Sequence, residues 1–340
     1  MPRPDRGAPY SYPHSQGMPV LIEAIVGREN ASHGAAVVSA TDVVVTNGGM
    51  HALSLAIRDA AWQGYDHAVC LTPVFHSVSE ILAAEGFVIS EVPVGTRAVD
   101  LDLIRRRCER PGTLLYLNLP HNPTGVTLTA PLEQLVRELV RESNVLVLYD
   151  AVYDSFRFEP AARPVPLDLV PATSRFVVVN SMSKNYGRPG DRIGWILARQ
   201  DVTARLTANV EREVVAVSAA SQLAAAQAIH TGNELLVEAV RVGRDVYRRT
   251  AAFGTQELPA GGTQVWLDLG VVDIERFADF ALEKHHLVLA TSSNYFAAPP
   301  GHVRLPTGAP PALIQEGLWT LAVALREWAQ SSGGAVRSKC

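Results

Sequence analysis

Residues that could carry out chemistry stand directly after apolar runs of this chain. Lys184 follows the run Arg175–Asn180, and only two other lysines occur among the 340 residues, so a reaction that needs a lysine amine has few candidate positions. Asp150 closes the run Val145–Tyr149. A carboxylate at the end of a buried strand is costly unless it meets a cation or a strong hydrogen-bond donor. Both residues are therefore candidates for a polar site.

Two further segments offer groups that could hold a ligand. The run Asp42–Thr46 ends in Asn47-Gly48-Gly49-Met50 before a helical pattern. Glycines there let backbone N–H groups and a helix N-terminus face an anion such as phosphate, although a plain turn fits equally well. The run Thr113–Leu117 leads into Pro120-His121-Asn122-Pro123-Thr124-Gly125, which by itself predicts a rigid turn.

The elements that would position these residues alternate between short apolar runs and helical patterns. Besides the runs above, we expect strands at His67–Leu71, Phe87–Pro93 and Arg192–Ala198, with helices at His51–Trp62, Ser77–Ala84 and Leu132–Arg141. Short apolar runs without alternation indicate strands buried on both faces, and such strands form largely parallel sheets. The sequence thus predicts an α/β fold in which ligands bind beyond the carboxyl ends of the strands.

The pattern changes after Arg199. Two long helical patterns, at about Val202–His230 and Glu234–Gln256, precede a strand at Thr263–Leu269, a helix near Ile274–His285, two short strands and a final helix near Pro311–Gln330. We expect this segment to form a smaller second domain that the N-terminal stretch joins. The length of the chain is compatible with two domains.

Composition excludes several classes of protein. With 47% hydrophobic residues, 19% charged residues and a net charge of −4, the chain is neither disordered nor suited to neutralising nucleic-acid phosphates. Cys70, Cys108 and Cys340 are widely spaced, which argues against a disulfide framework and against a metal site. The N-terminus has no apolar core, and the apolar stretch Val214–Ile229 is too short and too polar to span a bilayer. We therefore expect a cytoplasmic protein that binds neither membranes nor nucleic acid.

Four motifs together resemble a known family. Asn-Pro-Thr-Gly at 122–125, Asp-Ala-Val-Tyr-Asp at 150–154, Ser-Met-Ser-Lys at 181–184 and Gly-Asp-Arg-Ile-Gly-Trp at 190–195 look like fold-type I pyridoxal-5'-phosphate (PLP) enzymes of the class I/II aminotransferase family. The resemblance extends from about Tyr12 to the last helix. It implies a three-layer α/β/α large domain with a mostly parallel sheet at 40–232 and a smaller α+β domain at 233–340. Residues 1–39 would join the small domain and the dimer interface.

The resemblance also implies roles around the cofactor ring. Lys184 would hold PLP as a Schiff base and move a proton during catalysis, since the pKa of a lysine falls readily away from water. Asp150 would pair with the ring nitrogen and keep the ring an electron sink. Asn122 and Tyr153 would hydrogen-bond the ring's 3'-oxygen, Tyr153 with a catalytic role, and Phe75 would stack on the ring.

A second group would bind the phosphate of PLP. It comprises the backbone of Gly48, Gly49 and Met50, the Ser181 hydroxyl, the Arg192 guanidinium and, as a further contact, Ser183. Tyr12 resembles the tyrosine that reaches the phosphate from a neighbouring subunit, which implies a homodimer with a shared active site.

Arg304, in the second domain, matches the arginine that binds the substrate α-carboxylate, with Asn122 beside it. Its alternative role is that of a surface arginine on an edge strand. Arg188 and Asp191 depart from the family pattern; they could neutralise each other or mark a substrate with a polar or basic side chain. Family members also usually carry an additional arm before the segment that begins here at Tyr12.

The reaction that these roles imply is ping-pong transfer of an α-amino group from an L-amino acid to a 2-oxo acid, with specialised natural-product metabolism as one setting. The same carbanion chemistry also serves elimination, replacement, cyclisation and oxidation, so another PLP-dependent reaction is the first alternative. A PLP-sensing module without turnover is the second. A nicotinamide-dependent dehydrogenase is excluded because Asn47-Gly48-Gly49 lacks the glycine fingerprint of that fold.

Overall fold

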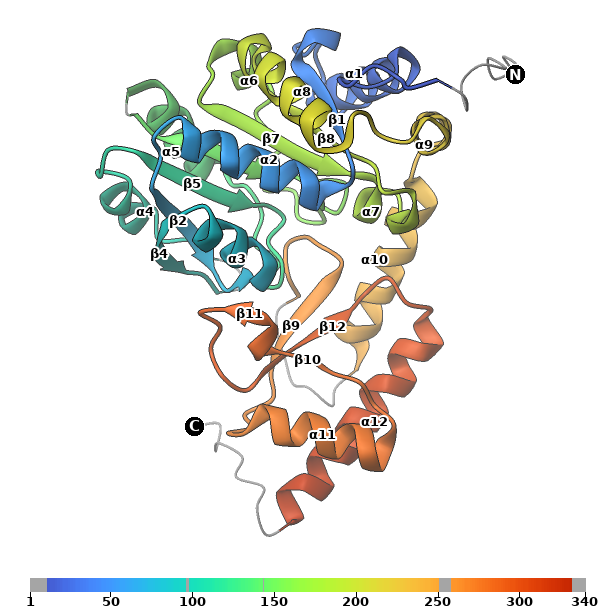
Figure 1. The fold of residues 1–340 in the computed structure, drawn as a ribbon. Coiled ribbons are helices and arrows are strands. Elements are labelled where there is room, and N and C mark those ends of the chain that lie inside the picture. Colours follow the sequence, from blue (N-terminus) through green and yellow to red (C-terminus); the bar gives the residue numbers. More distant parts are fainter. Residues whose placement is uncertain (1–10, 96–97, 143, 251–257, 332–340) are drawn as a thin grey trace.

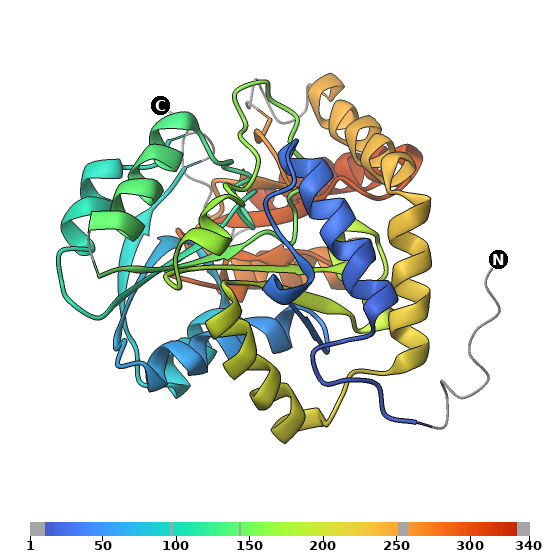
Figure 2. The same ribbon diagram turned by 90° about the horizontal axis from the view of Figure 1, so that it is seen from above.

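A mostly parallel sheet covered by helices on both faces forms the larger part of the molecule (Figures 1 and 2). The computed structural model describes residues 11–95, 98–142, 144–250 and 258–331. The strands are β1 (Val43–Thr46), β2 (His67–Thr72), β3 (Val74–Phe75), β4 (Val88–Pro93), β5 (Thr113–Asn118), β6 (Leu146–Asp150), β7 (Phe176–Ser181), β8 (Gly194–Leu197), β9 (Gln264–Asp268), β10 (Ala290–Thr291), β11 (Tyr295–Phe296) and β12 (His302–Pro306). The helices are α1 (Pro19–His33), α2 (Gly49–Trp62), α3 (His76–Ala84), α4 (Leu101–Arg107), α5 (Ala130–Glu142), α6 (Leu169–Ala172), α7 (Met182–Asn185), α8 (Gln200–Val214), α9 (Ala219–Thr231), α10 (Glu234–Arg249), α11 (Ile274–His285) and α12 (Pro311–Gln330).

The large sheet has seven strands in the order β1-β8-β7-β6-β5-β2-β4. Strands β4, β2, β5, β6 and β7 pair in parallel, whereas β8 runs antiparallel to both β7 and β1. Strand β1 therefore points the same way as β7, and its carboxyl end reaches the same edge of the sheet. The predicted α/β class and the mostly parallel sheet are confirmed.

Alternate residues of each strand face the two helical layers. In β6, Val147 packs into the core with α1, α5 and α9, and Leu148 packs into the opposite core with α2, α3 and α8. Because both faces are buried, β1, β2, β5, β6, β7 and β8 consist mostly of apolar residues, which made them recognisable in the sequence; the edge strand β4 is largely exposed. This double burial leaves the strand ends as the place where polar side chains can gather.

The smaller part of the molecule contains the sheet β10-β12-β9, whose pairings are antiparallel, and the helices α10, α11 and α12 (Figure 1). Its core includes Phe277, Leu318 and Trp328. A separate two-stranded sheet pairs β11 with β3, so one short strand from each part of the chain forms a bridge between the two bodies. The predicted smaller α+β domain is confirmed.

Two expectations differ from the structure. The pattern at Val202–His230 is not one helix: α8 ends at Val214, Val215 has φ 61° with a tight turn from Ala216 N–H to Val214 O, and Ser218 caps α9 by accepting a hydrogen bond from Ser221 N–H. A run of β-branched residues followed by a serine cap favours such a break. The second difference concerns residues 1–39. We expected them to join the small domain, whereas Leu21 and Ile25 of α1 pack in the core of the large sheet beside α9.

Other boundaries agree closely with the sequence patterns. Helices α11 and α12 have the predicted bounds, and the pattern at Glu234–Gln256 corresponds to α10 up to Arg249, while 251–257 lie outside the described residues. Cys70 and Cys108 are buried free thiols, and Cys340 lies outside the described residues. Among the described helices, none has the length and apolar character needed to cross a membrane.

Candidate active site

The carboxyl edge of the large sheet carries the residues that the sequence singled out. Asn118, Asp150 and Ser181 are the last residues of β5, β6 and β7, and Gly194 opens β8 directly opposite Ser181. A cavity of about 350 Å³ opens at this edge. It is lined by Gly49, Met50, Leu53, Phe75, Val78, Tyr116, Asn118, Asn122, Asp150, Val152, Tyr153, Ser181, Ser183, Lys184, Pro189, Arg192 and Arg304.

Lys184 extends into this cavity from α7, the short helix that follows β7. Its ammonium group forms no hydrogen bond or ion pair with any residue that the structure describes. Partial burial and the positive charge of Arg304 lower the pKa of Lys184. A lysine amine with a lowered pKa is suited to react with a carbonyl group and to take up a proton.

Asp150 lines the cavity and is buried. Its carboxylate accepts hydrogen bonds from the Tyr116 hydroxyl at 2.8 Å and from Val152 N–H at 3.3 Å. Burial dominates over these two donors and raises the pKa of Asp150 to about 6. A buried carboxylate that lacks a cation is costly, so this position favours a positively charged group beside it.

The end of β1 and the start of α2 form an open cradle. Gly48, with φ 84°, lies so close to Arg192 that a Cβ atom would collide with the guanidinium, and a Cβ on Gly49 would lie 3.3 Å from that of Ser181. Arg192 is held by a 3.0 Å hydrogen bond from Nη1 to Pro189 O. The N-terminus of α2, a hydroxyl and a guanidinium therefore converge on one point, an arrangement that suits an anion.

The opposite wall comes from the β5–α5 segment and from the small domain. Asn122 accepts hydrogen bonds at Oδ1 from Arg304 Nη1 at 3.5 Å and from the Tyr295 hydroxyl at 3.1 Å. Burial raises the pKa of Tyr153, which keeps its hydroxyl protonated near neutral pH. Phe75 is 39% exposed and lies edge-on to Tyr295. Arg304 therefore faces the cavity, not the surrounding solvent.

Three residues considered in the sequence analysis, Tyr12, Arg188 and Asp191, do not line this cavity. Tyr12 is 84% exposed and does not line the cavity of its own chain. Arg188 and Asp191 pair with each other: Arg188 Nη2 donates to Asp191 Oδ1 at 3.2 Å, and Arg188 Nε contacts Oδ2. Ser183 and Met50 line the cavity as expected.

Sequence reasoning missed three polar residues of the site. Tyr116 stands inside an apolar strand, where a tyrosine is indistinguishable from a core residue. Asn118 was given no role, yet its side chain accepts a hydrogen bond from Asn122 N–H at 2.8 Å and donates to Asp150 O at 3.2 Å. Tyr295 lies 173 positions from Asn122, and no local pattern predicts that contact.

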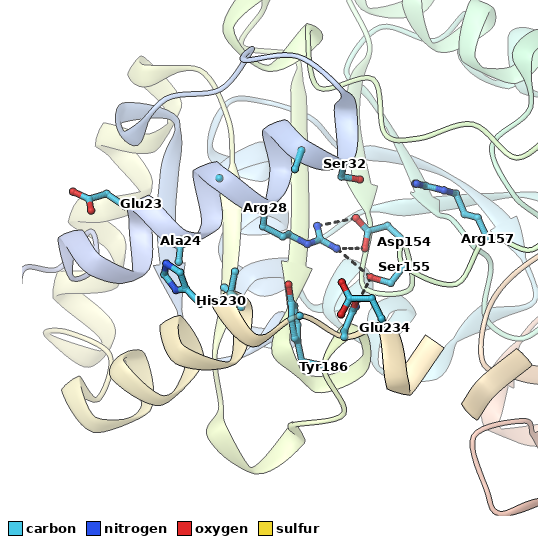
Figure 3. A pocket seen from close by; sticks show the side chains of 15 residues that line it. Glu23, Ala24, Arg28, Ser32, Asp154, Ser155, Arg157, Tyr186, His230 and Glu234 are labelled. Atoms are coloured by element: carbon cyan, nitrogen blue, oxygen red, sulfur yellow. Dashed lines mark hydrogen bonds and ion pairs between the residues drawn. The ribbon is translucent and has the colours of Figure 1, made fainter. Parts of the chain in front are cut away.

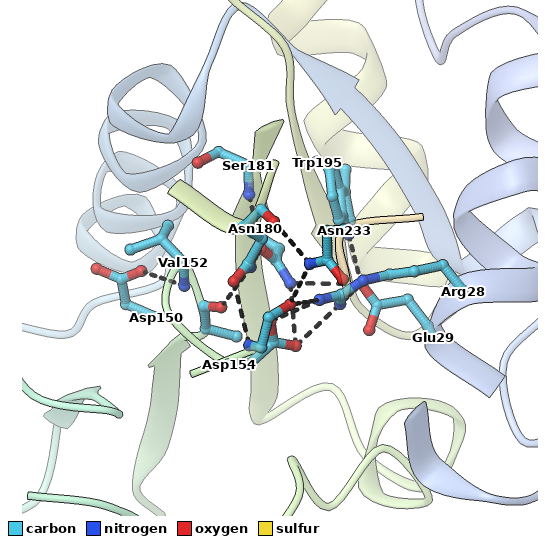
Figure 4. A network of polar contacts seen from close by, with 12 residues as sticks. Arg28, Glu29, Asp150, Val152, Asp154, Asn180, Ser181, Trp195 and Asn233 are labelled. Carbon is cyan, nitrogen blue, oxygen red and sulfur yellow. Dashed lines mark hydrogen bonds and ion pairs between the residues drawn. The ribbon is translucent and has the colours of Figure 1, made fainter. Parts of the chain in front are cut away.

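A buried polar network supports the segments that carry Lys184 and Asp150 (Figure 4). Arg28 of α1 donates to Asp154 at 2.9 Å, and Asn233 donates to Asn185 O at 2.6 Å. Asn185, the residue after Lys184, also donates to Asn180 Oδ1 at 2.8 Å. The network joins α1, the segment after β6, α7 and the start of α10. These contacts connect the segments that carry Lys184 and Asp150 to α1 and α10.

A larger cavity, of about 470 Å³, lies on the other side of this network between α1 and the start of α10 (Figure 3). Arg28 and Asp154 are among its lining residues, and their charges are engaged with each other. Lys184, Asp150 and Arg304 do not line it. By size alone this cavity would be the candidate active site. The smaller cavity at the strand ends is the better candidate because the reactive groups line it.

Comparison with known proteins identifies the family to which this constellation belongs. The sequence profile described as Aminotransferase class I and II matches residues 5–319. The chain belongs to the class I and II aminotransferase family. Its activity is that of a PLP-dependent aminotransferase.

Two related proteins are similar over most of the chain. An L-aspartate:5-guanidino-3-methyl-2-oxopentanoate transaminase of Pseudomonas syringae pv. syringae is 38% identical over 326 residues, which cover 94% of this chain and 84% of that protein. The 3-methylarginine biosynthesis aminotransferase ArgM of Streptomyces arginensis is 38% identical over 314 residues, 90% of this chain and 82% of that protein. The crystal structure of aspartate aminotransferase from Thermotoga maritima superimposes with a TM-score of 0.84 at 23% identity, covering 93% of this chain and 84% of that one, and shows the same fold.

The residues present in this aminotransferase fit the cofactor of its family. The cradle at Gly48 and Gly49 is open where a side chain would block it, and it suits a phosphate group. The buried Asp150 carboxylate has no cationic partner among the residues that the structure describes, and a protonated ring nitrogen would supply one. Lys184 lines the same cavity as both of these features.

Proposed function

We propose that this aminotransferase transfers the amino group of L-aspartate to 5-guanidino-3-methyl-2-oxopentanoate and so forms 3-methylarginine. The observation that carries the proposal is the 38% identity, over nine tenths of the chain, to two proteins whose names state this transamination and this biosynthesis. The charges around the cavity are compatible with it, because Lys184, Arg192 and Arg304 are cations, and both substrates and the cofactor bring anionic groups. The setting would be specialised metabolism of an amino acid.

In this proposal, three residues act on the substrate and on the ring of the cofactor. Arg304 binds the α-carboxylate, and its planar guanidinium fixes the orientation of Cα relative to Lys184. Lys184 Nζ takes the proton from Cα, a task that its lowered pKa supports. When bound, PLP supplies an aldehyde that accepts the amino group and a ring that accepts electrons. Asp150 keeps the ring nitrogen protonated.

The remaining residues of the site would hold the cofactor. The backbone N–H groups at Gly48, Gly49 and Met50 bind the phosphate together with three side chains, those of Ser181, Ser183 and Arg192. Asn122 and Tyr153 donate hydrogen bonds to the phenolic oxygen of the ring, and Phe75 packs on the ring face. These roles are supported by the cavity at the strand ends, which all of these residues except Gly48 line together.

The proposal includes a cytoplasmic homodimer. The high exposure of Tyr12 in the single chain supports a role toward the site of a partner subunit, where its hydroxyl would reach the phosphate. Two buried, unpaired cysteines support a reducing compartment. Within each subunit, residues 40–232 would bind the cofactor, and residues 233–340 would supply Arg304.

The test supplies purified, PLP-loaded protein with L-aspartate and 5-guanidino-3-methyl-2-oxopentanoate and measures oxaloacetate and 3-methylarginine by mass spectrometry. We expect equal amounts of both products. The matched comparison replaces the acceptor with the same oxo acid lacking the 3-methyl group, and then with 2-oxoglutarate. Amino transfer to 2-oxoglutarate alone would refute the proposed substrate. Release of ammonia or hydrogen peroxide without amino transfer would instead indicate elimination or oxidation.

A further inference from the structure

Tyr295 lies where the small domain meets the active-site cavity. Its strand, β11, pairs with β3 so that Tyr295 is directly opposite Phe75. The ring is buried, with Trp266 at a centroid distance of 5.3 Å and Phe75 at 6.4 Å, both in edge-on contact. Strand pairing and two aromatic neighbours therefore fix the position of the hydroxyl group.

The hydroxyl contacts a side chain whose orientation can be deduced. Arg304 Nη1 lies 3.5 Å from Asn122 Oδ1, and a guanidinium can only donate hydrogen bonds. The atom of Asn122 that faces Arg304 must therefore be the amide oxygen. The Tyr295 hydroxyl lies 3.1 Å from the same oxygen and so acts as a donor too. The amide nitrogen of Asn122 is then free to face the cavity, and it forms no hydrogen bond with the described residues.

We infer that Tyr295 is a positioning residue that holds the side-chain amide of Asn122 with its nitrogen toward the ring oxygen of the cofactor. The inference rests on the proposed cofactor site and deepens it. Arg304 has to share its N–H donors between Asn122 and the substrate carboxylate that it would bind. The Tyr295 hydroxyl donates its one proton to Asn122, so its role in the proposed site is to hold the side-chain amide. Burial also raises the pKa of Tyr295, so the hydroxyl remains a donor over the working pH range.

The test removes the Tyr295 hydroxyl alone, with Tyr295→Phe, and follows the visible absorption of the bound cofactor as a function of pH. A donor at the ring oxygen stabilises the deprotonated form of the bound cofactor, so a weaker contact raises the pH at which the absorption changes. We expect the midpoint to rise by about half to one pH unit, the size of one ordinary hydrogen bond, because Tyr295 contacts the neutral amide and not the ring itself. Tyr247→Phe is the matched control, because that hydroxyl bonds Pro306 O at 2.7 Å within the small domain.

A double-mutant cycle separates positioning from a general packing effect. If Tyr295 acts through Asn122, Tyr295→Phe should cause no further shift in an Asn122→Ala background. Equal shifts in both backgrounds, or a wild-type midpoint in Tyr295→Phe, would overturn the inference while leaving the proposed function intact. A wild-type protein that shows no cofactor absorption after loading would overturn both. Thermal denaturation of each variant verifies that the fold is retained.

Discussion

The buried carboxylate of Asp150 makes the cofactor-free protein sensitive to pH. Burial raises its pKa from 3.8 to about 6. Between about pH 4 and pH 6 the unfolded chain has released this proton while the folded chain retains it, so the free energy of unfolding falls as the pH rises. Two pKa units correspond to about 3 kcal/mol, and most of this loss is complete by about pH 6.

The perturbation that isolates this effect is Asp150→Asn, which keeps the shape of the side chain and removes its ionisation. We expect the stability of the wild type, measured relative to Asp150→Asn by urea unfolding of the cofactor-free proteins, to fall by about 2 kcal/mol between about pH 4.5 and pH 7.5. Asp279→Asn, at an exposed position of α11, is the control with the same charge change and should show no such trend. Loading with PLP should abolish the trend, because a protonated ring nitrogen supplies the missing cation.

The reasoning fails if the difference between wild type and Asp150→Asn is constant across this pH range. It also fails if the wild type gains stability relative to the variant as the pH rises. Either result would mean that the hydrogen bonds from Tyr116 and Val152 N–H outweigh the burial of the carboxylate.

Two further predictions concern binding and support of the site. Arg304→Lys should lower kcat/KM roughly 10- to 100-fold for both substrates, because a lysine cannot form the bidentate contact with the carboxylate. Steady-state kinetics measures this, and unchanged values would show that Arg304 does not bind the substrate. Asp154→Ala should lower the free energy of unfolding by about 3 kcal/mol, because Arg28 loses a buried partner, whereas Asp191→Ala, at the partly exposed pair with Arg188, should lower it by less than about 1 kcal/mol. Urea unfolding measures both values, and the reverse order of the two variants would contradict a stabilising role of the buried network.

Local sequence predicted the framework of this enzyme well. The parallel strands are short, continuous apolar runs, since both faces are buried, and each ends in polar residues that the sheet topology brings to one edge. Lys184 and Asp150 could be singled out because a rare amine and a buried carboxylate are unusual at such positions. The resemblance of four motifs then pointed to the family that the comparisons confirm.

Features that depend on distant partners could not be predicted in this way. The contact between Tyr295 and Asn122 exists only because β11 pairs with β3. Helix α1 was missed since its polar and apolar residues do not separate onto two faces, and its burial depends on packing against α9. We predicted one continuous helix where the structure has α8 and α9, because the sequence did not show that Ser218 caps a new helix after the turn at Val215.

The central claim is that Lys184 is the residue that binds the cofactor covalently. Reduction of the PLP-loaded protein with borohydride, followed by proteolysis and mass spectrometry, locates the covalently modified peptide. We expect the modification on the Ser-Met-Ser-Lys peptide at 181–184 and none in Lys184→Ala. Modification of another lysine in the wild type, or a fully loaded protein with this peptide unmodified, would contradict the assignment of the active site.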